Sequence, residues 1–221
     1  DSSRSIESTR VMNGNASDFS YDSRGKLHPG PAANRLAFKR RGEMGIKNTS
    51  QQWGWLSKVL HWLTALIIFL QIPLGFYAES LRLSPLKMDM FVWHKSLGML
   101  VFLLLVIRLL WRIKGTIPQS LSASGAQKCI SQAAHWLLYG LMAVLPISGW
   151  IISSAANIPI KLFWLIPLPA IVGPDESLKS VAAELHHLSV LVLVAVLILH
   201  IGAALRHHLL MQDNTMRRMW F

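Results

Sequence analysis

Residues 184–209 read ELHHLSVLVLVAVLILHIGAALRHHL, and this stretch decides the fold. Its middle is as apolar as lipid, and about 18 or more such residues in a row predict a helix that crosses a membrane. The stretch nevertheless contains five histidines, and His200 lies inside the apolar run. Ionisable side chains are costly in lipid and usually mark function. The stretch therefore predicts a membrane helix with functional histidines.

Three further apolar runs lie upstream, and together with the last run they cover residues 56–78, 91–113, 131–154 and 183–210. The chain of 221 residues is 52% hydrophobic and only 15% charged, which is too apolar for an ordinary soluble domain. We therefore expect an all-α fold, an integral membrane four-helix bundle formed by residues 51–221.

The net charge of +11 is unevenly distributed along the chain. Basic residues cluster before the first run, after the second and after the fourth, whereas the other two loops mix both signs. Because positively charged loops resist translocation, both termini are expected in the cytoplasm. This pattern indicates a membrane protein, and we expect no nucleic-acid partner.

Residues 1–50 differ from the rest of the chain. They are rich in Ser, Asn, Gly and Arg and poor in large apolar residues, so we expect a tail that is disordered or docks a partner redox protein. The single cysteine, Cys129, lies in a predicted cytoplasmic loop. It excludes an internal disulfide and a cysteine-ligated iron–sulfur cluster within this chain.

Spacing sorts four histidines into two pairs. His186 and His200 are 14 residues apart, nearly four helical turns, so they share a face and stand about 21 Å apart along the axis. His94 is near the start of the second run and would meet His186 at the outer level. His61 is near the start of the first run and would meet His200 at the inner level.

Two histidines at each of two levels suit bis-histidine haem inside a four-helix bundle. Structural zinc needs four ligands at one point, whereas a planar macrocycle supplies four nitrogen atoms itself. Gly98, Gly140 and Gly202 would let rings or helices approach closely. For any single histidine, an interhelical hydrogen bond is the plainer explanation, and a histidine-lined transporter or metal permease is a further alternative.

An ordered set of motifs carries a family resemblance: HW at 61–62, WHKSLG at 93–98, HWLLYGLMAVLPISGW at 135–150 and LHIGAALRHH at 199–208. In this order the chain resembles the bacterial cytochrome b561 family over about residues 53–220. The resemblance implies a multi-pass protein of the bacterial inner membrane with two noncovalent haem b groups. Carried over, the axial ligands are His61, His94, His186 and His200.

Other polar residues are candidates for the remaining roles that the resemblance implies. His135 and His207 would meet at the inner mouth of the bundle and bind a quinone headgroup, to whose reduction a histidine can relay protons. Arg108, Arg112 and Arg206 are predicted to pair with haem propionates. The alternatives are histidines solvated by lipid headgroups and arginines that anchor the inner face.

The function expected from the resemblance is transmembrane electron transfer through two haem b groups to or from ubiquinone. Some family members oxidise superoxide at the outer face, which makes that activity the leading expectation, with Lys87, Lys95 and Lys161 steering the anion. The alternative is a haem b subunit that anchors a dehydrogenase or hydrogenase and passes its electrons to quinone.

Overall fold

The computed structural model describes residues 19–21, 27–29, 45–49, 52–116, 118, 125–211, 216 and 218–220. The chain divides into two units, Asp1–Gly45 and Ile46–Phe221. In the first, strand β1 (Phe19–Tyr21) pairs antiparallel with β2 (Leu27–Pro29). The prediction that residues 1–50 are disordered or dock a partner falls mostly outside the described residues.

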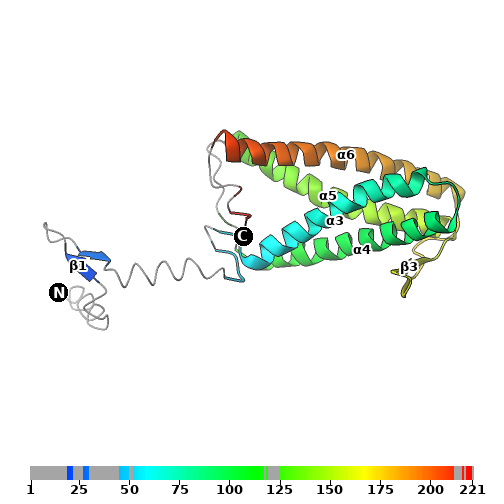
Figure 1. Ribbon diagram of the computed structural model, residues 1–221, viewed down its shortest axis with the longest axis horizontal. Helices are drawn as coiled ribbons and strands as arrows, with labels where there is room; N and C mark the ends of the chain where they lie inside the picture. Colours follow the sequence, from blue (N-terminus) through cyan, green and yellow to red (C-terminus); the bar gives the residue numbers. More distant parts are fainter. Residues whose placement is uncertain are drawn as a thin grey trace. The chain divides into compact units, whose positions relative to one another are not determined.

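The second unit is built on four long helices, each apolar and long enough to cross a membrane. They are α3 (Trp55–Ser80), α4 (Pro85–Lys114), α5 (Gly125–Ala155) and α6 (Glu176–Leu209). Successive helices run in opposite directions (Figure 1). The prediction of four membrane helices is confirmed, and the fold is mostly rather than purely helical, because it also contains short strands.

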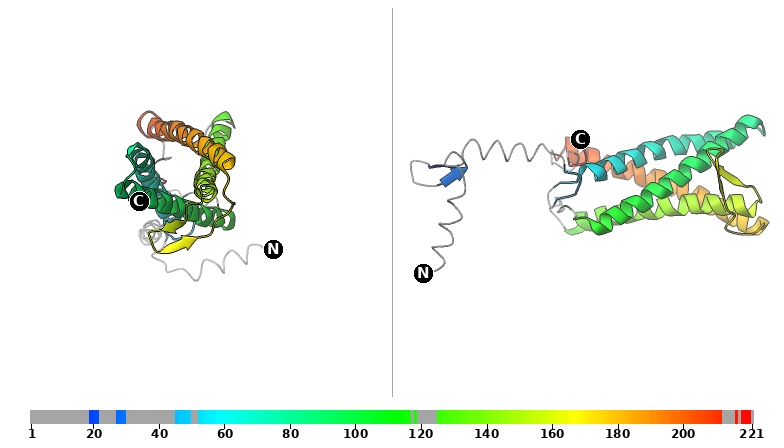
Figure 2. Two further views of the ribbon diagram at one scale, coloured as in Figure 1. Left: turned by 90° about the vertical axis from the view of Figure 1, so that its right-hand side faces the viewer. Right: turned by 90° about the horizontal axis from the view of Figure 1, so that it is seen from below.

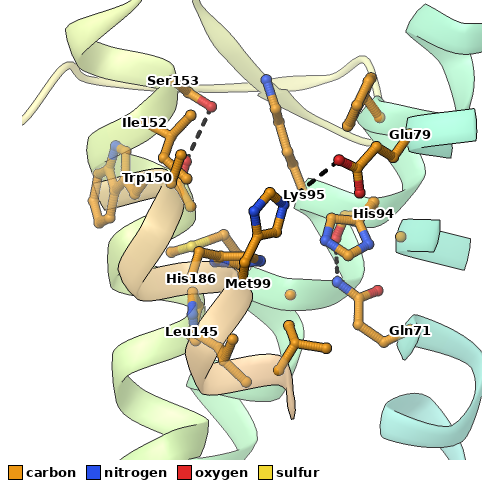
Figure 3. A pocket seen from close by; sticks show the side chains of 18 of the residues that line it. Gln71, Glu79, His94, Lys95, Met99, Leu145, Trp150, Ile152, Ser153 and His186 are labelled. Atoms are coloured by element: carbon orange, nitrogen blue, oxygen red, sulfur yellow. Dashed lines mark hydrogen bonds and ion pairs between the residues drawn. The ribbon is translucent and has the colours of Figure 1, made fainter. Parts of the chain in front are cut away.

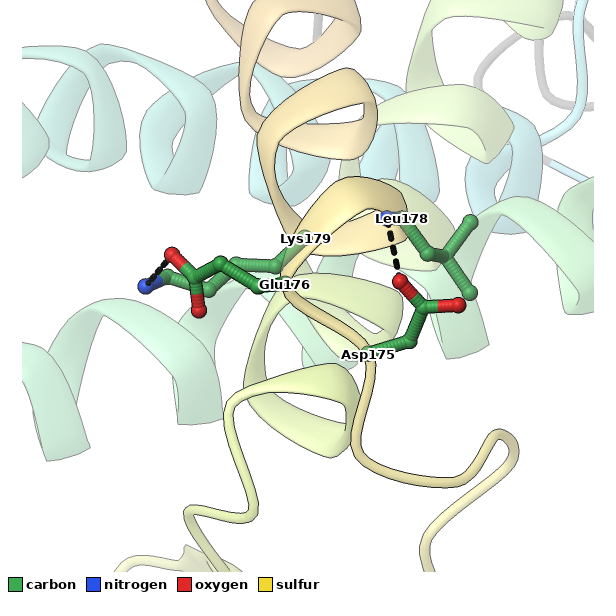
Figure 4. Close-up of polar contacts among 4 residues, drawn as sticks. All are labelled: Asp175, Glu176, Leu178 and Lys179. Carbon is green, nitrogen blue, oxygen red and sulfur yellow. Dashed lines mark hydrogen bonds and ion pairs between the residues drawn. The ribbon is translucent and has the colours of Figure 1, made fainter.

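Three helices begin one or two turns before the apolar runs that predicted them, and polar caps start two of the three, α4 and α6. The Ser84 hydroxyl accepts a hydrogen bond from the Lys87 amide, and Pro85 occupies the first turn of α4. The Asp175 carboxylate accepts one from the Leu178 amide at 3.0 Å and starts α6 (Figure 4). These first helical turns contain too many polar residues to be included in an apolar run.

The helices pack as two close pairs, α3 with α4 and α5 with α6, and α4 also contacts α5. Figure 2 shows the two pairs facing each other across the middle of the bundle. Large apolar side chains also cover the outside, for example Leu103 and Ile198, as expected where lipid is the solvent. The buried core consists of Leu60, Ile67, Ile68, Val101, Leu104, Leu105, Tyr139, Leu141, Met142 and Leu193.

The connection between α5 and α6 folds into a small hairpin of β3 (Ile160–Leu162) and β4 (Ile166–Leu168). The Phe163 amide donates to the buried Ser96 hydroxyl on α4 at 2.7 Å, which ties the hairpin to the bundle. The sequence predicted only a segment that caps the bundle, and the pairing is an added finding. We call this end of the bundle the hairpin end.

The opposite end, where α3 begins and α6 ends, is here called the termini end. There the Lys58 ammonium donates to the Trp220 carbonyl at 2.6 Å, and the Trp62 indole donates to the Met219 carbonyl at 2.8 Å. The Trp62 and Trp220 rings also meet edge to face. This C-terminal clasp holds residues 219–220 against the first turns of α3.

Candidate functional site

Two of the predicted histidines face each other at the hairpin end. His94 projects from α4 and His186 from α6, and their ring centroids are 6.4 Å apart with planes at 68° (Figure 3). Bonds of about 2 Å from one metal ion to a nitrogen of each ring, plus the radius of each ring, account for a separation of this size. The two rings can therefore bind one metal ion between them.

The other two predicted histidines form a matching pair toward the termini end. The ring centroids of His61 on α3 and His200 on α6 are 6.5 Å apart, again with planes at 68°. The structure thus brings together both pairs that spacing predicted. Because α6 contributes one histidine to each, the two sites are stacked along that helix.

A cavity of about 710 Å³ surrounds the first pair. Its walls are mainly apolar, with residues from all four helices, and His94 and His186 are among the lining side chains (Figure 3). A large, mostly apolar cavity with a few convergent polar groups is typical of a cofactor site. No group of three or more His, Cys, Asp or Glu side chains suited to a bare metal ion occurs among the described residues.

Glycines leave room for the rings at this cavity. A Cβ at Gly75 of α3 would stand 2.7 Å from Cε1 of His94, which is closer than side chains tolerate, and one at Gly149 of α5 would be 3.5 Å from His186. The sequence pointed instead to Gly98, Gly140 and Gly202. A Cβ at Gly98 would contact Gln71, and none of the described atoms lies within 4 Å of a Cβ at the other two.

Hydrogen bonds hold the ring of His186 and the backbone of His94 in the hairpin-end pair. Nδ1 of His186 lies 2.9 Å from the hydroxyl of buried Ser148, and the Gln71 amide donates to the His94 carbonyl at 2.7 Å. Nδ1 of His61 and Nδ1 of His94 are buried without a hydrogen-bond partner among the described residues. A buried polar atom needs a partner, so the protein alone leaves these imidazoles incompletely satisfied. The residues present fit a macrocycle-bound metal held by imidazoles.

Cationic side chains gather near the termini-end pair. The guanidinium groups of Arg108 and Arg112 lie 5.6 and 5.8 Å from the centre of the Tyr139 ring, and Arg112 also donates to its hydroxyl at 3.4 Å. Arg108 interacts electrostatically with His61 and His200. The third predicted propionate partner, Arg206, is an exposed residue in the last turn of α6.

His135 lies nearer to a predicted ligand than expected. Its ring centroid is 5.5 Å from that of His200, and its Nδ1 is 2.6 Å from the Ser131 carbonyl. The sequence predicted a meeting with His207 at the mouth of the bundle. His207 lies in the last turn of α6, about two turns beyond His200. Contact of His135 with the termini-end pair is therefore an addition to the prediction.

The lysines predicted to steer an anion have different surroundings. Lys95 is half-buried and lines the cavity of the hairpin-end pair (Figure 3). Lys87 also lines it, but its ammonium donates to the carbonyls of Glu79 and Leu81 at the end of α3. Lys161 is exposed on β3.

Sequence reasoning missed Ser148, Gly75, Gly149 and the C-terminal clasp. Serine and glycine are common inside membrane helices, where they usually serve helix packing. Only the approach of another helix shows which of them faces a histidine ring. The one available signal was that Ser148 and Gly149 lie in the motif carried over from the family.

Comparison with known proteins agrees with this geometry. Cytochrome b561 homolog 2 of Escherichia coli (strain K12) is 32% identical over 184 residues, covering 80% of this chain and 95% of that protein. Probable superoxide oxidase CybB of Yersinia pestis is 27% identical over 164 residues, 72% of this chain and 90% of that protein. Cytochrome b561 homolog 1 of Escherichia coli (strain K12) is 24% identical over 165 residues, 72% of this chain and 92% of that protein.

The prokaryotic cytochrome b561 family matches residues 52–221, nearly the whole helical unit. The resemblance stated from the motifs is thereby confirmed. The chain belongs to the prokaryotic cytochrome b561 family and is a bacterial multi-pass membrane protein that transfers electrons through b-type haem.

Proposed function

We propose that this protein binds two haem b groups and moves electrons across the membrane between superoxide and ubiquinone. The observation that carries the proposal is the pair of histidine sites, 6.4 and 6.5 Å between ring centroids, that share α6. His94 and His186 would hold one haem, and His61 and His200 the other. Once bound, haem iron would supply a one-electron couple.

The hairpin end suits entry of an electron from a small anion. Lys95 is a half-buried cation beside the cavity that contains His94 and His186, and a cation in a cleft raises the local concentration of anions. Two superoxide anions would each give up one electron and leave as dioxygen. One ubiquinone would take both electrons and two protons to become ubiquinol.

The termini end suits the quinone. His135 lies beside His200, and its Nδ1–H donates to the Ser131 carbonyl. Nε2 of the neutral ring then accepts a hydrogen bond from a quinol hydroxyl, and the protonated ring donates one to a quinone carbonyl. Arg108 and Arg112 offer charge-assisted hydrogen bonds to haem propionates close by. His207 and Arg206 are proposed as lesser contributors from the last turn of α6.

Stopped-flow spectroscopy of the haem-loaded protein tests the function. Superoxide should reduce the haems within the mixing experiment, and added ubiquinone should reoxidise them. Superoxide dismutase in the syringe is the control that removes the donor. If the haems are reduced no faster than in a His94→Ala variant, superoxide is not the donor.

A second function rests on residues 1–51, which lie outside the family match. In this alternative the protein anchors a dehydrogenase or hydrogenase through its N-terminal region and passes that enzyme's electrons to quinone. Purification in mild detergent separates the two functions. A stoichiometric redox partner that is lost when residues 1–45 are deleted supports the anchor, whereas a self-sufficient cytochrome supports the oxidase.

The proposed topology places the termini end in the cytoplasm of a bacterial inner membrane. Arg108 and Arg112 near that end of α4 support this orientation under the positive-inside rule. Cys129 is the single cysteine, exposed near the start of α5, and so provides a direct test. An impermeant maleimide should label it in inverted vesicles and not in intact spheroplasts, and the reverse pattern would invert the topology.

A further inference from the structure

Ser148 differs from the other serines of α5 because it contacts a predicted haem ligand. It is 2% exposed, and its hydroxyl lies 2.9 Å from Nδ1 of His186 and 2.9 Å from the carbonyl of Leu145. Ser153, one turn further along, is equally buried, but its hydroxyl donates to the Gly149 carbonyl at 3.1 Å.

The Ser148 hydroxyl and the Leu145 carbonyl both interact with His186, and the chemistry of these groups favours one direction for each hydrogen bond. A hydroxyl has one hydrogen to donate and lone pairs that accept. The Leu145 carbonyl can only accept, so the Ser148 hydrogen goes to that carbonyl. The Ser148 oxygen then accepts from Nδ1–H of His186. A neutral imidazole protonated at Nδ1 has its free lone pair on Nε2, the nitrogen left to bind a metal.

We propose that Ser148 is the positioning residue of the hairpin-end haem and holds His186 in the tautomer and orientation that direct Nε2 at the iron. This inference rests on the proposed haem ligation by His186. A partner that accepts the second N–H of a ligating imidazole fixes the ring and makes the ligand more basic. Ser148 therefore stabilises the ferric form of this haem relative to the ferrous form.

The effect is local to one of the two sites. Nδ1 of His94 and Nδ1 of His61 lack hydrogen-bond partners among the described residues. Of these three predicted ligands, only His186 has a side-chain hydroxyl beside its second nitrogen in the described part of the chain. Loss of the hydroxyl should change the hairpin-end haem and leave the termini-end haem as it was.

Ser148→Ala and Ser153→Ala form a matched pair in the haem-loaded protein. Redox titration of Ser148→Ala should show one midpoint potential moved upward and the other unchanged, and the low-spin electron paramagnetic resonance signal of one haem should shift. Transfer of that haem to excess apomyoglobin should reflect an affinity about 10-fold weaker. Ser153→Ala should match the wild type in all three measurements.

Two further variants distinguish a failure of the Ser148 role from a failure of haem ligation by His186. Ser148→Thr retains a hydroxyl and should restore the wild-type potential and signal, which a purely structural role for the serine would not require. His186→Ala tests the haem site itself, and retention of both haems there would end the proposed ligation. If His186→Ala loses one haem while Ser148→Ala and Ser153→Ala give the same potentials and spectra, the positioning role is wrong and the ligation stands.

Discussion

The two ends of the bundle present the same pair of rings in different surroundings. At the hairpin end, glycines of α3 and α5 and the Ser148 hydroxyl surround His94 and His186. Toward the termini end, Arg108, Arg112 and His135 gather near His61 and His200 instead. The packing of the helices sets the distance between the two rings of a pair. The neighbouring side chains set the local charge and the space available at each pair. One geometry can therefore give two haems of different potential.

Removing a ligand is the strongest way to break the comparison. His94→Ala should lose about one of two haems per chain, because a single imidazole cannot hold the ring at the hairpin end. His61→Ala should lose the other haem. Haem per chain, measured by pyridine haemochrome, checks both. His187→Ala is the control, since that exposed residue neighbours His186 and should keep both haems. Loss of both haems in every variant would contradict two separate sites.

The next largest effect is expected from filling the space beside the His94 ring. A Cβ in Gly75→Ala would stand 2.7 Å from His94, and overpacking of this kind costs about 1–3 kcal/mol. The helix gains at most about 1 kcal/mol from replacing glycine, so a net loss is expected. Gly140→Ala, where a Cβ meets none of the described atoms within 4 Å, should be neutral or stabilising. The melting temperature and the haem content should be measured for both variants.

Removing a cation from the termini end should lessen the difference in charge between the two ends. Arg108 interacts electrostatically with His61 and His200, and its positive charge favours the reduced haem there. In Arg108→Gln the potential of the termini-end haem should fall by on the order of 60 mV, a tenfold change in a one-electron equilibrium. The other potential should stay constant. Equal shifts of both haems would mean that Arg108 does not act locally.

The smallest expected effect concerns the start of α6. The hydrogen bond from the Leu178 amide (Figure 4) and a second one from the Ser177 hydroxyl lower the pKa of Asp175. A carboxyl group with a lowered pKa stabilises the fold above its unfolded pKa, and that stabilisation disappears as the pH falls through the folded pKa. Asp175→Ala should therefore lower the melting temperature slightly at pH 7 and less in acid. A difference that grows in acid would contradict the cap.

The main features of the site followed from sequence because helical periodicity is rigid. His186 and His200 are 14 residues apart, which places both on one face of the helix. The alternation of chain direction then assigns His94 and His61 to their levels. The hairpin of β3 and β4 did not follow, since strands of three residues each are too short for an alternating pattern to stand out. Ser148 and Gly75 did not follow either, because their roles depend on how far apart two helices pack, which no local pattern encodes.

The C-terminal clasp has a consequence for how the protein is made. Met219 and Trp220 follow all four long helices in chain order, so their bonds to Trp62 and Lys58 form only after α6 has been made. The first turns of α3 therefore gain these partners only after α6 has been synthesised.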